Sequence, residues 1–161
     1  MAAAKHLHVA RLCAEQPFQV CSPKLLENRN ALRKPADLRG HMLLHVNDQQ
    51  DWSKWLETAG IKNVDPSRGP VLNQANMAID AAIDGQGVAL ARTALAAWDL
   101  IGGRLVRPFA IALPASFAYW IVSPKATAKL PKIKAFTDWL LAEASQDVRR
   151  LQKPRSKPHH A

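Results

Sequence analysis

The chain alternates short apolar runs with segments of helical periodicity, and this alternation most narrows the folds that it can adopt. Residues 41–46, "HMLLHV", have the length and composition of a strand, and residues 48–60 repeat apolar side chains at helical spacing. Residues 74–85 form a second expected helix, rich in small apolar residues, and residues 87–91, "GVALA", follow as a strand. Strand and helix in alternation predict an α/β sandwich with a largely parallel sheet.

Further strands and helices are expected on both sides of this central unit. The expected strands are "FQVCS" (18–22), "RLVRPF" (104–109) and "SFAYWIVSP" (116–124), and the expected helices are "PADLRG" (35–40), "RTALAAWDLIGG" (92–103) and "PKIKAFTDWLLAEAS" (131–145). The tryptophans have spacings that suit core packing, so we expect all of them to be buried. They are Trp52, Trp55, Trp98, Trp120 and Trp139.

Length and composition indicate a globular protein. With 161 residues and 48% hydrophobic composition, the chain can form one domain with a real core, or two small lobes. No apolar run approaches the roughly 20 residues of a membrane span, and no signal peptide is recognisable, so we expect a cytoplasmic protein. Cys13 and Cys21 have no CxxC partner, which favours reduced thiols over a disulfide or a metal site.

The positive charge is concentrated at the C-terminal end. The formal net charge is +9, from 22 basic and 13 acidic residues. Residues 148–161 hold five of the basic residues and no acidic one, so the rest of the chain carries 17 basic and 13 acidic residues, or +4. Such a tail can touch phosphates by charge alone, but Pro154 and Pro158 favour a solvated, disordered end over a nucleic-acid arm.

Motifs of enzymatic chemistry are missing. "GQG" at 85–87 follows a helix and precedes a strand, the reverse of a dinucleotide fingerprint. Asp80 and Asp84 can share one helix face for acid–base work, but solvated surface acids are the simpler interpretation. His41 and His45, expected on one strand, are better explained as core or rim residues than as metal ligands. We therefore expect no enzyme, no cofactor and no metal.

Taken in order, five segments resemble the effector-binding domain of the LysR-type transcriptional regulators, and within them the glycine-cleavage activator subfamily. The segments are "VCSPKLL" (20–26), "LRKPADLRGHMLLH" (32–45), "DWSKWLETAG" (51–60), "RGPVLNQANMAIDAAIDGQGVALARTALAAWDLIGGRLVRPF" (68–109) and "FAYWIVSPKATAKLPKIKAFTDWLLAEA" (117–144). Their order and spacing, from about residue 9 to residue 145, carry the resemblance.

The resemblance implies a type 2 periplasmic-binding-protein-like fold. In that fold, two Rossmann-like subdomains are joined by two crossing strands, which "FQVCSP" and "FAYWIVSP" match, and a small molecule lies in the cleft. The implied regions are 1–22, the first crossover strand and a remnant of subdomain I; 23–116, a complete subdomain II; 117–145, the return crossover strand and a helix of subdomain I; and 146–161, a basic disordered tail.

Family members begin with a winged helix-turn-helix that has no counterpart here, so we expect a truncated chain with an incomplete subdomain I. DNA is then a partner only through the missing N-terminal domain, and homo-oligomers are expected of the intact family. The helix at 131–145 should be poorly covered, and therefore mobile, dimerised or aggregated. A solute-binding protein of a transporter and a fragment without function are the alternatives.

The resemblance also places "LNQAN" (72–76) where subdomain II faces the cleft, at the start of a helix. Helix N-termini expose unpaired N–H groups and a partial positive charge, which suit a carboxylate or another small anion. Amide side chains donate and accept hydrogen bonds, and we expect one of these to be the N-cap. The expected ligand-binding residues are Asn73, Gln74, Ala75, Asn76 and Phe117, and the expected effector is an amino acid or small carboxylate.

Overall fold

The structure is a computed structural model that divides into two compact units. Unit 1 comprises Met1–Ala14 and Phe117–Ala161, and unit 2 comprises Glu15–Ser116. The residues that the structure describes are 6–27, 30–47, 50–114 and 117–152. Within these ranges, no helix combines the length and the apolar character needed to cross a membrane.

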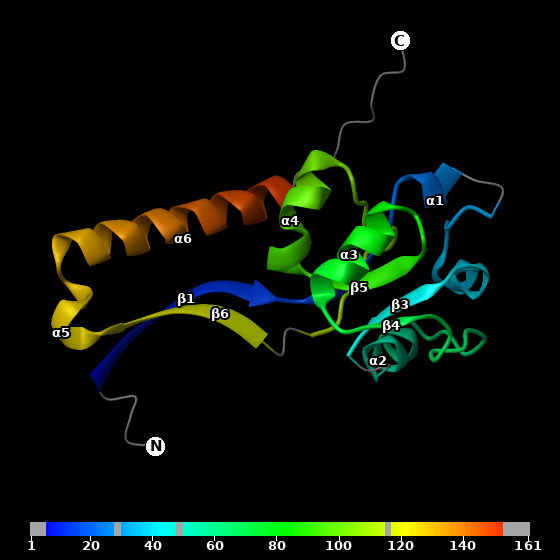
Figure 1. The fold of residues 1–161 in the computed structure, drawn as a ribbon, viewed down its shortest axis with the longest axis horizontal. Helices are drawn as coiled ribbons and strands as arrows, with labels where there is room; N and C mark the ends of the chain where they lie inside the picture. The colour runs from blue at the N-terminus through cyan, green and yellow to red at the C-terminus, as the bar shows by residue number, and fades with distance from the viewer. Residues whose placement is uncertain (1–5, 28–29, 48–49, 115–116, 153–161) are drawn as a thin grey trace, which may run out of the picture. The chain divides into compact units, whose positions relative to one another are not determined.

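Unit 2 is built on a four-stranded sheet with the strand order β2-β5-β3-β4 (Figure 1). The strands are β2 (Pro17–Val20), β3 (Leu43–Val46), β4 (Val71–Leu72) and β5 (Val88–Arg92). β3 runs parallel to both β4 and β5, whereas β2 pairs antiparallel with β5. The expected α/β fold with a largely parallel sheet is therefore confirmed, with β2 as an antiparallel edge.

Helices cover both faces of this sheet. They are α1 (Lys24–Glu27), the 3-10 helix η2 (Pro35–Gly40), α2 (Gln50–Thr58), α3 (Ala75–Ile83) and α4 (Thr93–Gly102). Successive side chains of a strand point to opposite faces. Leu43 accordingly packs in one buried cluster with Trp52 and Trp55 of α2, and its neighbour Leu44 packs in a second cluster with Ala78 of α3. The two clusters make unit 2 a three-layer sandwich.

Small side chains let α3 lie close to the sheet. Ala78 and Ala82 are buried on the helix, and Ala89 and Ala91 are buried on β5 in the same cluster. Alanine adds no rotamer entropy and little bulk, so the two backbones can approach each other. The small side chains of α3 and β5 thus account for their close packing.

Two glycines explain the "DGQG" turn that joins α3 to β5. Gly85 has φ 81°, a left-handed conformation that ends a helix at little cost only for glycine. A Cβ built on Gly87 would lie 2.5 Å from the carbonyl oxygen of Met42. The same carbonyl accepts a hydrogen bond from the N–H of Val88 at 2.9 Å. Gly87 therefore permits the backbone contact that starts the β3–β5 pairing.

The expected strand at 104–109 is wrong. Val106 forms only an isolated bridge with Cys21, held by two hydrogen bonds of 3.1 and 2.9 Å. Pro108 lacks the N–H that a continued ladder needs, which limits the pairing to one residue. A strand that the sequence did not predict, β1 (Leu7–Glu15), forms instead near the N-terminus.

Unit 1 contains a two-stranded sheet of β1 and β6 (Phe117–Pro124), followed by α5 (Lys125–Ala128) and α6 (Pro131–Gln152). The two segments matched to crossing strands lie in separate sheets, since β2 pairs with β5 and β6 pairs with β1. α6 extends seven residues past its expected end at 145. The tail predicted at 146–161 is thus helical up to Gln152, and its remainder lies outside the described residues.

Burial separates the two units. No residue of unit 1 is buried within 6–14 and 117–151. Trp52 and Trp55 of unit 2 are buried as expected, at 1% and 0% exposure. The expectation is wrong for the other three tryptophans, because no layer covers them. Their exposed fractions are 64% for Trp98, 55% for Trp120 and 55% for Trp139.

Candidate functional site

The amide-rich segment forms the turn between β4 and α3. β4 ends at Leu72 and α3 begins at Ala75, so Asn73 and Gln74 connect them. β4 is parallel to β3, and the turn leaves the carboxyl end of β4 (Figure 1). In open α/β sheets, ligands commonly bind outside the carboxyl ends of strands. The position of the predicted amides in unit 2 therefore suits a ligand site.

The capping of α3 differs from the expectation. Gln74 occupies the N-cap position with extended backbone angles, φ −142° and ψ 144°, but no side chain makes a cap hydrogen bond. The three amide side chains, those of Asn73, Gln74 and Asn76, are all exposed. The longer glutamine side chain caps less readily than asparagine, serine or aspartate. The first N–H groups of α3 are thus left without a capping side chain.

The charge around this helix start favours an anion. The first turn of α3 holds no acidic residue, so the partial positive charge of the N-terminus is not neutralised locally. Asp84 is the C-cap and Asp80 is exposed one turn before it, so both acids lie near the other end of the nine-residue helix. Backbone N–H groups and three amides therefore form a neutral, donor-rich surface at the start of α3.

The remaining predicted residues divide between the units. Ala75 is the first residue of α3 and is partly buried, and its position beside the exposed amides leaves only its backbone to offer a polar contact. Phe117 opens β6 in unit 1 and is 60% exposed. The structure thus groups the four residues of the α3 start in unit 2, and it places Phe117 in the other unit.

Two polar side chains that the sequence did not single out, those of Glu15 and Gln19, are buried. Glu15 is 2% exposed, and its Oε1 accepts a hydrogen bond of 3.0 Å from the N–H of Ala94 at the start of α4. Gln19 is fully buried, and its Nε2 donates to the carbonyl oxygen of Phe109 at 2.5 Å. Both bonds fasten the edge strand region to segments 79 and 90 residues away. No local sequence pattern predicts contacts between residues so far apart in the chain.

The histidines have structural partners. His41 follows η2, and its Nε2 lies 2.9 Å from the carbonyl oxygen of Asn30. His45 lies in β3, is 1% exposed and has its Nε2 3.3 Å from the carbonyl oxygen of Arg68. The expectation that one strand holds both is wrong, because β3 begins only at Leu43. Among the described residues, no three His, Cys, Asp or Glu side chains gather in a way that could hold a metal ion.

The two cysteines do not form a disulfide. Cys21 is buried in unit 2, and this burial raises the pKa of its thiol to about 12. A thiol with such a pKa is almost entirely protonated at neutral pH, so it is a poor nucleophile and a poor metal ligand. Cys21 is therefore a core residue.

Known proteins resemble the chain over most of its length. A model of the LysR substrate binding domain matches residues 3–145. The glycine cleavage system transcriptional activator of Escherichia coli K12 is 38% identical over 146 residues, which are 91% of this chain and 48% of that protein. The chain thus spans about half the length of the curated relatives it matches.

Solved structures agree in fold. The AmpR effector binding domain from Citrobacter freundii superposes with a TM-score of 0.67 at 26% identity, covering 87% of this chain and 68% of that one. The AmpR effector domain of Pseudomonas aeruginosa gives a TM-score of 0.65 at 28% identity, covering 90% and 69%. The fold is therefore that of type 2 periplasmic-binding-protein-like effector domains, which belong to transcriptional regulators and not to an enzyme family. The chain belongs to the LysR substrate-binding domain family.

Proposed function

We propose that this chain is an effector-sensing part of a LysR-type transcriptional regulator and that it binds a small carboxylate, such as an amino acid, at the start of α3. Family membership supports the regulatory role. The observation that carries the site is the uncapped N-terminus of α3 beside three exposed amides. We further propose that the protein is cytoplasmic. The family resemblance also favours homo-oligomers.

The chemistry of such a site follows from its donors. The backbone N–H groups of Ala75 and Asn76 can donate to carboxylate oxygens, and the helix dipole stabilises the bound negative charge. The amides of Asn73 and Gln74 can donate to the same carboxylate or accept hydrogen bonds from an ammonium group. Phe117 as a further contact rests on the resemblance alone.

Regulation needs a partner that the proposed ligand site does not supply. We propose that sequence-specific DNA binding resides in the part of the longer relatives that this chain does not match. DNA binding by the chain itself should then come from charge and weaken steeply with salt. A gel-shift assay with random and promoter DNA measures this, and salt-resistant, sequence-selective binding would contradict it.

The ligand site is tested by Asn73→Ala and Asn76→Ala, in this chain and in a full-length relative that carries the same segment. Calorimetry with the twenty amino acids and with short dicarboxylates identifies a binding probe. Each substitution should weaken that binding by about 1–3 kcal/mol, because a ligand group loses its partner.

Gln86→Ala is the matched control, since Gln86 is an exposed amide just past the C-terminal end of the same helix. It should leave affinity unchanged. If both asparagine variants bind as tightly as the parent chain, the amides are ordinary surface groups and the proposed site is wrong.

A further inference from the structure

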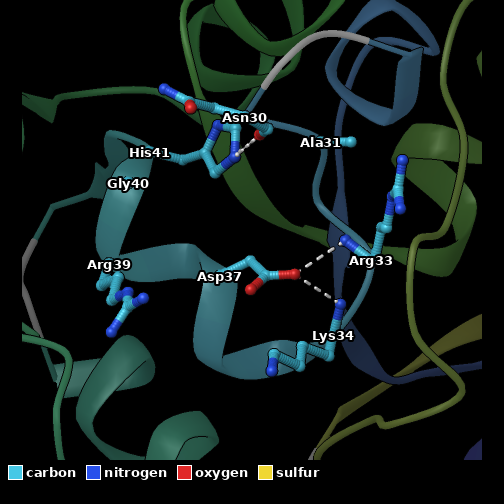
Figure 2. A pocket seen from close by; sticks show the side chains of 8 residues that line it. All are labelled: Asn30, Ala31, Arg33, Lys34, Asp37, Arg39, Gly40 and His41. Atoms are coloured by element: carbon cyan, nitrogen blue, oxygen red, sulfur yellow. Dashed lines mark hydrogen bonds between the residues drawn. The ribbon is translucent and has the colours of Figure 1, made fainter.

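A second polar surface of unit 2 lies over η2, and none of the amides of the α3 start belongs to it. It is an open pocket of about 600 Å³. Its lining residues are Asn30, Ala31, Arg33, Lys34, Asp37, Arg39, Gly40 and His41 (Figure 2). All of them come from one stretch of twelve residues.

The charge of this lining is positive. Arg33, Lys34 and Arg39 carry three positive charges, and the one acidic residue is Asp37. None of the three cations forms an ion pair with a residue that the structure describes. The lining therefore has a net charge of +2 with His41 neutral, and its cationic groups are available to a ligand.

Asp37 holds the backbone of the loop through hydrogen bonds. Its Oδ2 accepts hydrogen bonds from the backbone N–H groups of Lys34 at 2.9 Å and Arg33 at 3.0 Å (Figure 2). These bonds lower the pKa of the Asp37 carboxyl below its usual value, and the bond from Lys34 has the largest effect. The ionised side chain thus fixes the backbone that presents Arg33 and Lys34.

The pocket opens to solvent at Gly40, which is exposed. A Cβ built on Gly40 would meet no atom within 4 Å, so the space above this residue is unfilled. Beside it, the ring of His41 is held by its 2.9 Å contact with the carbonyl oxygen of Asn30. A bound group can therefore sit above Gly40 without displacing protein atoms.

We propose that this pocket binds a doubly charged oxyanion, and specifically the phosphate group of a small metabolite. A phosphate monoester carries a charge of about −1.5 to −2 near neutral pH, close to the opposite of the lining's net charge, and it accepts several hydrogen bonds from guanidinium and ammonium groups at once. Figure 2 shows Arg33, Lys34 and Arg39 pointing in different directions, so the ligand must draw them together. That cost predicts a millimolar affinity.

The test uses inorganic phosphate in an NMR titration of the intact chain at constant ionic strength set with NaCl. Saturable shifts confined to amides of residues 30–41 are expected. Shifts that are spread over the chain and do not saturate would overturn the proposal.

Substitution at Gly40 separates charge from bulk. Gly40→Glu places an anion in the open space and should weaken phosphate binding at least about fivefold relative to Gly40→Gln, which has the same size. Gly102→Glu is the matched charge control, because a Cβ there also meets nothing within 4 Å and Gly102 lies at the end of α4. Equal affinities for all three variants would overturn the proposal.

Asp37→Asn tests the charge in the opposite direction. It removes the only acid of the lining while keeping an oxygen that can accept the two N–H bonds, so phosphate should bind more tightly. A short DNA duplex distinguishes the source of the phosphate: it should not displace phosphate from residues 30–41. If duplex DNA occupies these residues and inorganic phosphate does not, the metabolite form of the proposal is wrong.

Discussion

Units 1 and 2 both carry a tryptophan on an amphipathic helix, but the tryptophan is buried in unit 2 and exposed in unit 1. Trp55 of unit 2 lies on the amphipathic helix α2 and is fully buried, with its ring 5.7 Å from that of Trp52 and 6.1 Å from that of Phe109. Trp139 of unit 1 lies on the amphipathic helix α6 and is 55% exposed, and its one ring partner among the described residues is Phe136 at 5.7 Å. Amphipathic periodicity therefore predicts a helix but does not ensure its burial.

The difference lies in the number of layers. Unit 2 has a four-stranded sheet with helices on both faces, so most of its large apolar side chains are buried in two clusters, although Trp98 of α4 stays exposed. Unit 1 has two strands and two helices, and a two-stranded sheet is only marginally stable without packing. α6 has to be stabilised by its own backbone hydrogen bonds and by pairs such as Lys134–Asp138, which contribute a few tenths of a kcal/mol each.

The largest expected effect is a contrast in hydrogen exchange. Amides of residues 76–84 in α3 should open only with unit 2 as a whole, at a cost that approaches its full unfolding free energy, about 5 kcal/mol or more. Amides of residues 131–145 should exchange several thousandfold faster, because no side chain within residues 131–151 is buried. Mass spectrometry of a monomeric preparation measures both. Equal protection of the two helices would show that unit 1 is covered after all.

A matched pair of substitutions gives the next effect. Trp55→Ala should lower the free energy of unfolding by about 3–5 kcal/mol, because it leaves a cavity in a closed core. Trp139→Ala should change it by less than about 0.5 kcal/mol, as expected of a surface residue. Urea unfolding followed by circular dichroism measures both. A comparable loss for Trp139→Ala would erase the difference between the units.

The smallest effect concerns pH. The pKa of Asp37 is lowered in the folded state, chiefly by the N–H of Lys34, so its contribution to stability is present above the usual carboxyl pKa of 3.8 and is lost as pH falls through the lower folded value. Asp37→Asn should flatten the acid limb of the stability curve slightly. Because the carboxylate is exposed, a large change would mean that surface charge, rather than layer number, sets the stability of unit 2.

The sequence predicted those parts of the fold that depend on local pattern. α2, α3 and α4 were expected because their apolar spacing and terminal glycines are local signals. β1 was missed because its nine residues show no clean alternation and it pairs with β6, more than 100 residues away. The strand expected around Val106 failed for the local reason of Pro108, which the β-rich composition of the segment masked.

The start of α3 was predicted in place, but its capping was not. Amides before an alanine-rich helix correctly predicted where α3 begins, whereas the absence of a cap hydrogen bond depends on how Gln74 is turned. The pocket over η2 could not be predicted from the sequence, because nothing in the sequence distinguishes Arg33, Lys34 and Arg39 from ordinary surface charges. Only the fold of the η2 segment shows that they border a common space.

The alternation along β3 and β5 has a consequence for tolerance to insertion. Leu43 and Val88 serve the tryptophan-rich layer, while Leu44 and Ala89 serve the alanine-rich layer. One residue inserted within a strand exchanges the two faces, so large side chains would meet the narrow α3 contact and alanines would leave voids beneath α2. We therefore expect unit 2 to tolerate insertions and deletions in its loops but not within its strands.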